Sequence, residues 1–421
     1  MINTSVGRPL LIAAGLFLFT FLFSGVAFAQ LENTDLPNRT GFKVSDMGLK
    51  AGDIRLHGAV KTSEEFETNV FLTPSKDKFD GITMVSPSAG IEIPFRKNMV
   101  SADYEADVYM YSTYHGENHI DHQGRGLIEL NLTDYKIQIK DTFRDYTDRA
   151  ADENSRRIGR DVNTFRASIG REFTNKFGFE VGYSHVWDAY SPADDLIFQQ
   201  VSYADRDRFT NIVDGTVSYR IMPKTHIFAE ADLGFINYYN SSIPPDSWYI
   251  DALIGMKGRP TNKILINLKG GFRYQGYDQS SVYSDKNYIG PVVMGGFDYL
   301  VTKKDTVNVS LERGVYESLY SNMNYLEANI VAMKYTHKFN NKMLVRAYGS
   351  YQLNLYPTAT NESGVIDKRY DNIYNFGCLG RYDIRRWLSA ELRYDYTQKS
   401  SRFAIYNYAD HRVSLSGTAG F

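Results

Sequence analysis

The chain has 421 residues, and its 47 Lys and Arg nearly balance its 49 Asp and Glu, which leaves a formal net charge of −2 at pH 7. This balance gives no reason to expect a nucleic-acid partner. Mean hydropathy is −0.38, and past residue 29 no apolar run is long enough for a membrane-spanning helix, so a helical membrane protein is excluded. The single cysteine, Cys378, excludes an internal disulfide.

The first residues predict a secretory signal peptide. Arg8 is followed by an apolar run from Leu10 to Phe23, and then by a small-x-small cleavage motif that ends at Ala29. An uncleaved membrane anchor would need a longer apolar run and a stop-transfer pattern. We therefore expect residues 1–29 to be removed and residues 30–53, which are polar and without periodicity, to form a short periplasmic lead-in.

From Ile54 onward, apolar and polar residues alternate in segments of roughly ten residues, the length that a tilted strand needs to cross a bilayer. Short connections that carry the Asn, Asp and Pro of tight turns centre on residues 95–98, 133–134, 174–176, 222–224, 259–262, 302–305, 339–341 and 384–386. Longer polar connections lie between them, at Thr147 to Asp161, Ala189 to Arg208, Tyr277 to Asn287 and Pro357 to Asp367.

This alternation predicts an all-β fold for residues 54–421, a transmembrane antiparallel up-and-down β-barrel with about eighteen strands, short periplasmic turns and long extracellular loops. The high aromatic content, 14% of residues, fits the aromatic girdles of such a barrel. A soluble β-sandwich alternates too, but it would rarely repeat the pattern so many times over one chain. The expected location is the outer membrane of a Gram-negative bacterium, in contact with its lipids and lipopolysaccharide.

The last twelve residues show the alternation most clearly. Leu415, Ala419 and Phe421 share an apolar parity, while Ser416 and Thr418 share the polar one. A terminal aromatic residue on the apolar parity resembles the signal by which the bacterial assembly machinery reads the last strand of an outer-membrane barrel. We therefore expect that machinery to be a partner through the strand that ends at Phe421.

The polar parity predicts the inner face of the barrel. About eighteen strands enclose a lumen too wide for side chains to fill, so a water-filled channel is expected. The candidate pore-lining residues are Asp103, Glu105, Asp107, Tyr109, Arg125, Glu129, Lys136, Lys140, Arg144, Arg166, Glu230, Asp232, Lys269, Arg273, Arg346, Tyr348, Glu391, Arg393, Asp395 and Arg412. Neither sign of charge dominates, and a mixed wall would suit a hydrated sugar chain, whereas a wall of one sign would favour charge-selective uptake. The same charges would equally keep a plain pore wet, or pair between adjacent strands.

Two further groups of residues have alternative interpretations. Tyr109, Tyr316 and Tyr348 share the inward parity and could stack on sugar rings, although tyrosines near strand ends also serve as interface anchors. The tight turns are rich in cations, which would dock an acidic periplasmic partner or simply lie solvated at the lipid headgroups: Lys97, Lys176, Lys224, Arg259, Lys303, Lys304, Arg385 and Arg386.

Signals for an enzyme are weak, and no cofactor is expected. His115, His119 and His122 lie in one segment together with two carboxylates, which makes them a weak candidate for a metal site. Their spacing matches no closed structural site. A barrel hydrolase would need a paired Ser and His on the wall, and neither His185 nor His337 offers such a pair.

Two stretches carry a resemblance to a known family. They are EEFETNVFLTP at residues 64–74 followed by GITMVSP at 81–87, and a second set that runs from Glu312-Arg313 through ESLY at 317–320 and YTHKF at 335–339 to Tyr356. Both resemble the putative β-barrel porin 2 family, and the likeness spans essentially the whole expected barrel. The departures are Glu67 and Thr68, where the family more often has turn-like Asn or Asp.

The resemblance implies a role in exopolysaccharide production, in which the barrel forms the outer-membrane port above a periplasmic polysaccharide export protein. The first functional hypothesis is therefore an export port. The alternatives are a general diffusion porin for small hydrophilic solutes and a surface-binding, adhesin-like barrel that uses its long loops. A loop folded into the lumen, such as Ala189 to Arg208, would favour regulated export over open diffusion.

Overall fold

The computed structural model describes residues 48–75, 78–148, 157–174, 176–191, 206–239, 245–278, 287–318, 323–362 and 364–421. Their strands are β1 (Leu49–Ala51), β2 (Ile54–Glu67), β3 (Asp80–Phe95), β4 (Asn98–Tyr111), β5 (His119–Asn131), β6 (Tyr135–Asp148), β7 (Ile158–Glu172), β8 (Phe177–Tyr190), β9 (Arg208–Met222), β10 (Thr225–Tyr238), β11 (Ser247–Thr261), β12 (Ile264–Tyr277), β13 (Tyr288–Leu300), β14 (Asp305–Glu317), β15 (Tyr325–Lys338), β16 (Met343–Glu362), β17 (Val365–Arg385), β18 (Leu388–Ser401) and β19 (Tyr408–Gly420). Two 3-10 turns, η1 (His115–Glu117) and η3 (Ala404–Tyr406), lie in connections. No helix among these residues is long and apolar enough to cross a membrane.

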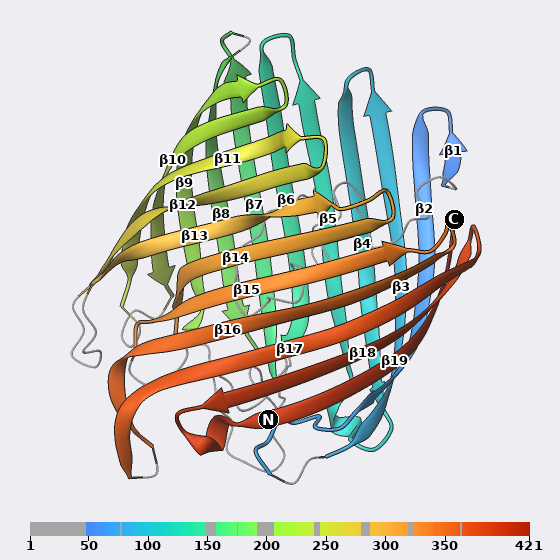
Figure 1. Ribbon diagram of the computed structural model, residues 1–421, viewed down its shortest axis with the longest axis vertical. Coiled ribbons are helices and arrows are strands. Elements are labelled where there is room, and N and C mark those ends of the chain that lie inside the picture. Colours follow the sequence, from blue (N-terminus) through green and yellow to red (C-terminus); the bar gives the residue numbers. More distant parts are fainter. Residues whose placement is uncertain are drawn as a thin grey trace, which may run out of the picture.

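Strands β2 to β19 form one closed antiparallel barrel of 18 strands, which confirms the predicted fold class and strand number. Each strand pairs with the next one in the chain, and β19 pairs with β2 from Arg412↔Glu67 to Gly420↔Ala59. At the end of this seam, the amide N–H of Phe421 donates to the carbonyl of Gly58 at 2.8 Å. In Figure 1 the red strand β19 meets the blue strand β2, so the terminal strand completes the wall.

The two ends of the barrel differ in their connections. Tight turns join the strands at one end, for example Arg96 and Lys97 between β3 and β4. At this same end, β1 pairs with β2 through Gly52 and Asp53, so the last part of the expected lead-in is a short strand and not irregular chain. Residues 1–47, with the predicted signal peptide, lie outside the described residues. So do most of the predicted loops Thr147 to Asp161, Ala189 to Arg208 and Tyr277 to Asn287.

The predicted loop Pro357 to Asp367 was wrong. Strands β16 and β17 continue through it as a long hairpin, in which Ala359 pairs with Lys368 and Glu362 with Val365. A register shift between Leu355 and Ala359 separates this extension from the regular wall. Its polar composition is that of a hairpin with solvent on its outer side, and such a strand cannot be told from a loop by hydropathy.

The predicted turn at residues 259–262 also lies slightly later, because β11 runs on to Thr261. A register shift falls between Gly258 and Thr261, and Gly258 has a φ of +124°. A Cβ at Gly258 would overlap the backbone carbonyl oxygen of Lys224 in the neighbouring turn. The close approach of the two turns therefore requires glycine.

Replacing Gly258 with valine is accordingly expected to abolish or strongly reduce barrel assembly, because the side chain meets backbone and the φ is one that β-branched residues avoid. The measurement is the fraction of protein with the heat-modifiable migration of a folded barrel on unboiled gels. Gly380→Val is the matched control, since a Cβ there meets no atom within 4 Å. Equal folding of both variants would contradict the requirement for glycine.

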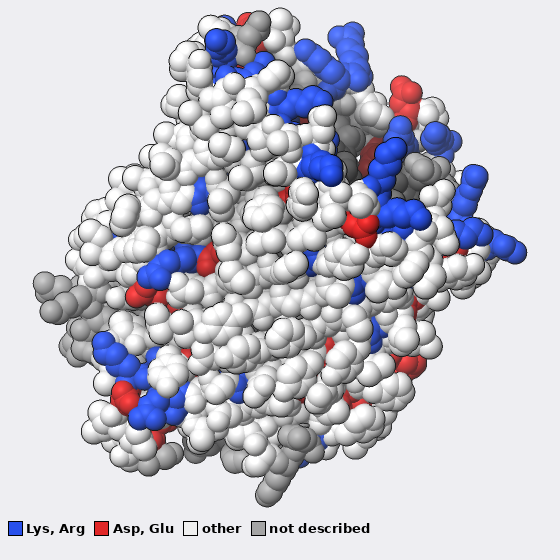
Figure 2. Space-filling view, viewed as in Figure 1, with Lys and Arg blue, Asp and Glu red and all other residues white. Residues whose placement is uncertain are grey.

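Register and burial separate the two faces of the wall. Tyr238 of β10 and Gln275 of β12 hydrogen-bond to Glu317 at the end of β14, each at 2.8 Å. Because these strands are not neighbours in the wall, their side chains can meet only on its inner face. The opposite parity is apolar and exposed, as in Ile254 at 73%, Ile289 at 77% and Leu415 at 60%. Figure 2 shows a broad band with few charges on this side, and Lys and Arg gathered towards the turn end at upper right. This is the pattern of a lipid-facing belt with a wet interior.

Candidate functional site: the inner wall

All the candidate pore-lining residues lie on the inner parity of their strands. On β4, Asp103 stands opposite Arg125 of β5, and on β18, Asp395 stands opposite Arg412 of β19. The remaining candidates follow from the same register on β6, β7, β10, β12 and β16. The structure gives their position, and their part in transport stays a prediction.

Neighbouring strands pair many of these charges. Arg125 lies 3.5 Å from Asp103, Lys136 lies 3.4 Å from Glu129, and Lys269 is ion-paired with Glu230. Arg412 of β19 reaches Glu65 of β2 at 3.7 Å, so an ion pair also spans the closing seam. Half-buried pairs like these stabilise strand pairing and leave polar atoms along the lumen.

Two arginines make stronger, two-point contacts with carboxylates that the sequence analysis did not select. Arg273 donates from Nε and Nη2 to the two oxygens of Asp251, each at 2.7 Å. Arg166 of β7 reaches over β8 to Asp214 of β9, with Nη2 at 2.7 Å from Oδ2. Gly182 on β8 makes this possible, because a Cβ there would lie 2.6 Å from Asp214 Oδ1. Bidentate geometry fixes both partners on the wall.

The charges are not spread evenly around the wall. Asp103, Glu105 and Asp107 occupy successive inward positions of β4, and Asp107 stands opposite Asp121 of β5. On β6, Lys136, Lys140 and Arg144 recur at every second inward position. A negative column and a positive column are therefore separated by a single strand, which sets up an electric field across this part of the lumen.

A buried ionic group lies at the loop end of β7, β8 and β9. Asp188 accepts hydrogen bonds from Arg160 Nε at Oδ1 and from Arg160 Nη2 at Oδ2, at 2.7 Å each, and Arg208 Nη2 also lies 2.7 Å from Oδ2. Asp188 is 3% exposed. None of the three was among the predicted site residues. Their inward-facing positions were the signal that could have selected them. However, Asp188 and Arg208 lie at the ends of the predicted loop Ala189 to Arg208, where the sequence leaves the ends of the strands open.

Contacts at this same end join inward-facing side chains of several strands. Glu317 receives hydrogen bonds from Tyr238 and Gln275, and Tyr277 lies 3.4 Å away from it. Arg206, which precedes β9, donates to the carbonyl of Ser318 at 3.0 Å and so ties the foot of the β8–β9 loop to β14. The predicted gating loop Ala189 to Arg208 lies largely outside the described residues, and gating by it stays a prediction.

The three histidines of the weak metal candidate have separate partners in the structure. His119 has the inner parity and stacks on Tyr109, with ring centroids 4.5 Å apart. His122 has the outer parity and bonds to Tyr104, while His115 bonds to the carbonyl of Tyr111. The described residues contain no group of three or more metal-ligating side chains. His119 and His122 are three residues apart on β5 and so fall on opposite faces of the wall, while His115 lies in the turn η1.

The model of the family described as putative beta-barrel porin 2 matches residues 44–421. The chain belongs to this family. No curated protein matches it. Among solved structures, this chain resembles OccAB4 of Acinetobacter baumannii, at 10% identity and a TM-score of 0.46, over 88% of this chain and 99% of that one.

This chain also resembles a second solved structure, the outer membrane protein opdK of Pseudomonas aeruginosa. The identity is 13% and the TM-score 0.44, over 87% of this chain and 99% of that one. OccK2 of the same organism, solved in complex with glucuronate, resembles this chain at 9% identity and a TM-score of 0.46, over 88% and 98% of the two chains. With its family and its closed wall, this chain is a β-barrel of the outer-membrane porin type.

Proposed function

We propose that this protein is a passive channel for small hydrophilic solutes in the outer membrane of a Gram-negative bacterium. The observation that supports this most directly is the inner wall, where charges of both signs line a closed barrel of 18 strands. Barrels of this size enclose an aqueous lumen. A wall with both signs of charge holds water and admits polar solutes without demanding one charge. Assembly through the terminal strand β19 is part of the same proposal.

Export of an exopolysaccharide is less well supported than diffusion. A port for a sugar chain would need free aromatic faces along its path, but the candidate tyrosines are occupied. Tyr109 stacks on His119, and Tyr316 is bonded to Glu312 and packs against a cluster around Met323 and Tyr356. Tyr348 is 8% exposed and bonded to Asp395. These rings pack against other side chains of the wall and do not present a free surface for stacking on a sugar.

Liposome swelling separates the two functions. Purified protein in vesicles is expected to admit a monosaccharide such as arabinose, with rates that fall steeply as the sugar grows to a tetrasaccharide, because diffusion through an aqueous pore depends on solute size. Protein-free vesicles and vesicles with boiled protein are the controls. Absence of swelling with any sugar, while the protein migrates as a folded barrel, would overturn the diffusion proposal.

A further inference from the structure

A hollow of about 720 Å³ lies on the wall over β9 to β13. Most of the side chains that line it have the outer parity, so it opens toward the membrane and not into the lumen. They form two rows that run across the strands. In the row nearer the tight turns, register joins Tyr219 to Ile227, Ile227 to Met256 and Met256 to Leu268.

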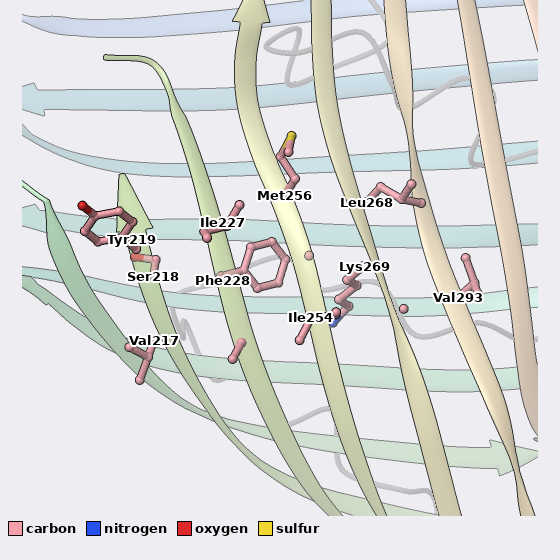
Figure 3. A pocket seen from close by; sticks show the side chains of 13 residues that line it. Val217, Ser218, Tyr219, Ile227, Phe228, Ile254, Met256, Leu268, Lys269 and Val293 are labelled. Carbon is pink, nitrogen blue, oxygen red and sulfur yellow. The ribbon is translucent and has the colours of Figure 1, made fainter. Parts of the chain in front are cut away.

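The second row explains why the surface is hollow. Register joins Val217, Ala229, Ile254, Gly270 and Val293 in this order across five strands. Ala229 and Gly270 have small side chains or none, while Val217, Ile254 and Val293 stand up beside them. Figure 3 shows the lining side chains from these neighbouring strands lying side by side. The result is an apolar groove whose lining suits a hydrocarbon chain.

Cations lie at the turn end of this groove. Lys224 is in the turn between β9 and β10, and Arg259 lies near the turn between β11 and β12. The two meet directly, because the N–H of Arg259 donates to the carbonyl of Lys224 at 2.7 Å. Ile227 and Met256 are each three residues from one of them. Both cations are exposed, so their long side chains can reach the groove's end from the headgroup level.

A carboxylate close to this rim is already engaged, because Glu172 at the end of β7 is paired with Arg220 of β9 at 2.9 Å. Next to the groove, Phe177 packs on Tyr219 with ring centroids 4.8 Å apart, and exposed aromatics of this kind mark the level of the membrane interface. The positive charge of Lys224 and Arg259 therefore lies at the depth where lipid phosphates are found.

We propose that the groove over β9 to β13, together with Lys224 and Arg259, binds an anionic glycerophospholipid of the periplasmic leaflet. One acyl chain lies along the apolar rows, and the phosphate contacts the two cations. An anionic headgroup is preferred to a zwitterionic one because it brings no ammonium group to the positive rim. A second copy of the chain fits less well, since it would bring further rim cations to the same place.

The test is lipid retention by the full chain in detergent, measured by native mass spectrometry after addition of phosphatidylglycerol or phosphatidylethanolamine. Wild-type protein is expected to retain one phosphatidylglycerol in preference to phosphatidylethanolamine. The double variant K224Q/R259Q is expected to lose roughly twenty-five-fold in apparent affinity, because each basic residue beside an anionic lipid contributes a factor of about five. Ala229→Leu, which fills the groove from an exposed position, is expected to weaken both lipids.

The matched control is R385Q/R386Q, which removes two exposed cations from the β17–β18 turn, far from the groove along the wall. It is expected to retain the lipid as wild type does. Equal retention by K224Q/R259Q and R385Q/R386Q would overturn the assignment, as would equal retention of the two lipids by wild type. A dimer in lipid nanodiscs that Ala229→Leu dissociates would overturn it too, because a second copy would then occupy the groove.

Discussion

Replacing Asp188 with alanine is expected to lower the free energy of unfolding by about 3–5 kcal/mol, the usual cost of removing one partner from a buried ion pair. Asp188 is hydrogen-bonded to Arg160 and ion-paired with Arg208, and its own exposure is 3%. Without the carboxylate, two guanidinium groups are left next to each other on a largely dry part of the wall. Desolvation of the two cations and the repulsion between them then both destabilise the folded barrel.

The measurement is a urea titration of protein refolded in phospholipid vesicles, followed by tryptophan fluorescence. Asp383→Ala is the matched control. Its carboxylate pairs with Arg381 at 2.9 Å but is more than a third exposed, so a loss under about 1 kcal/mol is expected. Asp188→Asn keeps the side chain's size and should fall between the two. Similar small losses for Asp188→Ala and Asp383→Ala would show that the triad contributes little to stability.

The alternating pattern made much of this wall predictable. On β18, Glu391 and Arg393 are predicted to line the pore, and the register places them on the inner face with Leu392 and Tyr394 on the opposite one. The reason is physical, since a strand between lipid and water is stable in only one orientation, with its apolar side chains toward the lipid. In the segment 326–337 both faces carry apolar residues, so alternation alone does not indicate which face is inside. Leu326 and Ala328 pack inside against Met323 and Tyr356, so the interior is locally dry there.

The partners of the charges were beyond the sequence. Parity places Arg166 on the inner face, but only the register over three strands shows that it reaches past Gly182 to Asp214. The same applies to Asp188, which meets Arg160 and Arg208 because β7, β8 and β9 are aligned at their loop ends. Ion selection depends on such pairing, since a paired charge contributes less to the field in the lumen than an unpaired one.

Neutralising Lys140 and Arg144 together is expected to shift the channel's selectivity toward cations, and neutralising Glu105 and Asp107 to shift it toward anions. Each double variant removes two charges from one column and leaves the pairs Lys136–Glu129 and Arg125–Asp103 in place. The ratio of cation to anion permeability should change by roughly a factor of ten at low ionic strength, in opposite directions, because charges of one sign in a confined wall concentrate their counter-ions. Reversal potentials in planar bilayers under a KCl gradient give this ratio.

Asp141→Asn is the control for this prediction, because Asp141 lies on β6 between the two cations but has the outer parity and bonds to Asn163 at 2.8 Å. It should leave the reversal potential unchanged. Raising the salt from 0.1 M toward 1 M shortens the screening length from about 10 Å to about 3 Å and should shrink both opposite shifts. If the two double variants moved the reversal potential in the same direction, or if Asp141→Asn moved it as far as they do, the columns on β4 and β6 would not line the conducting path.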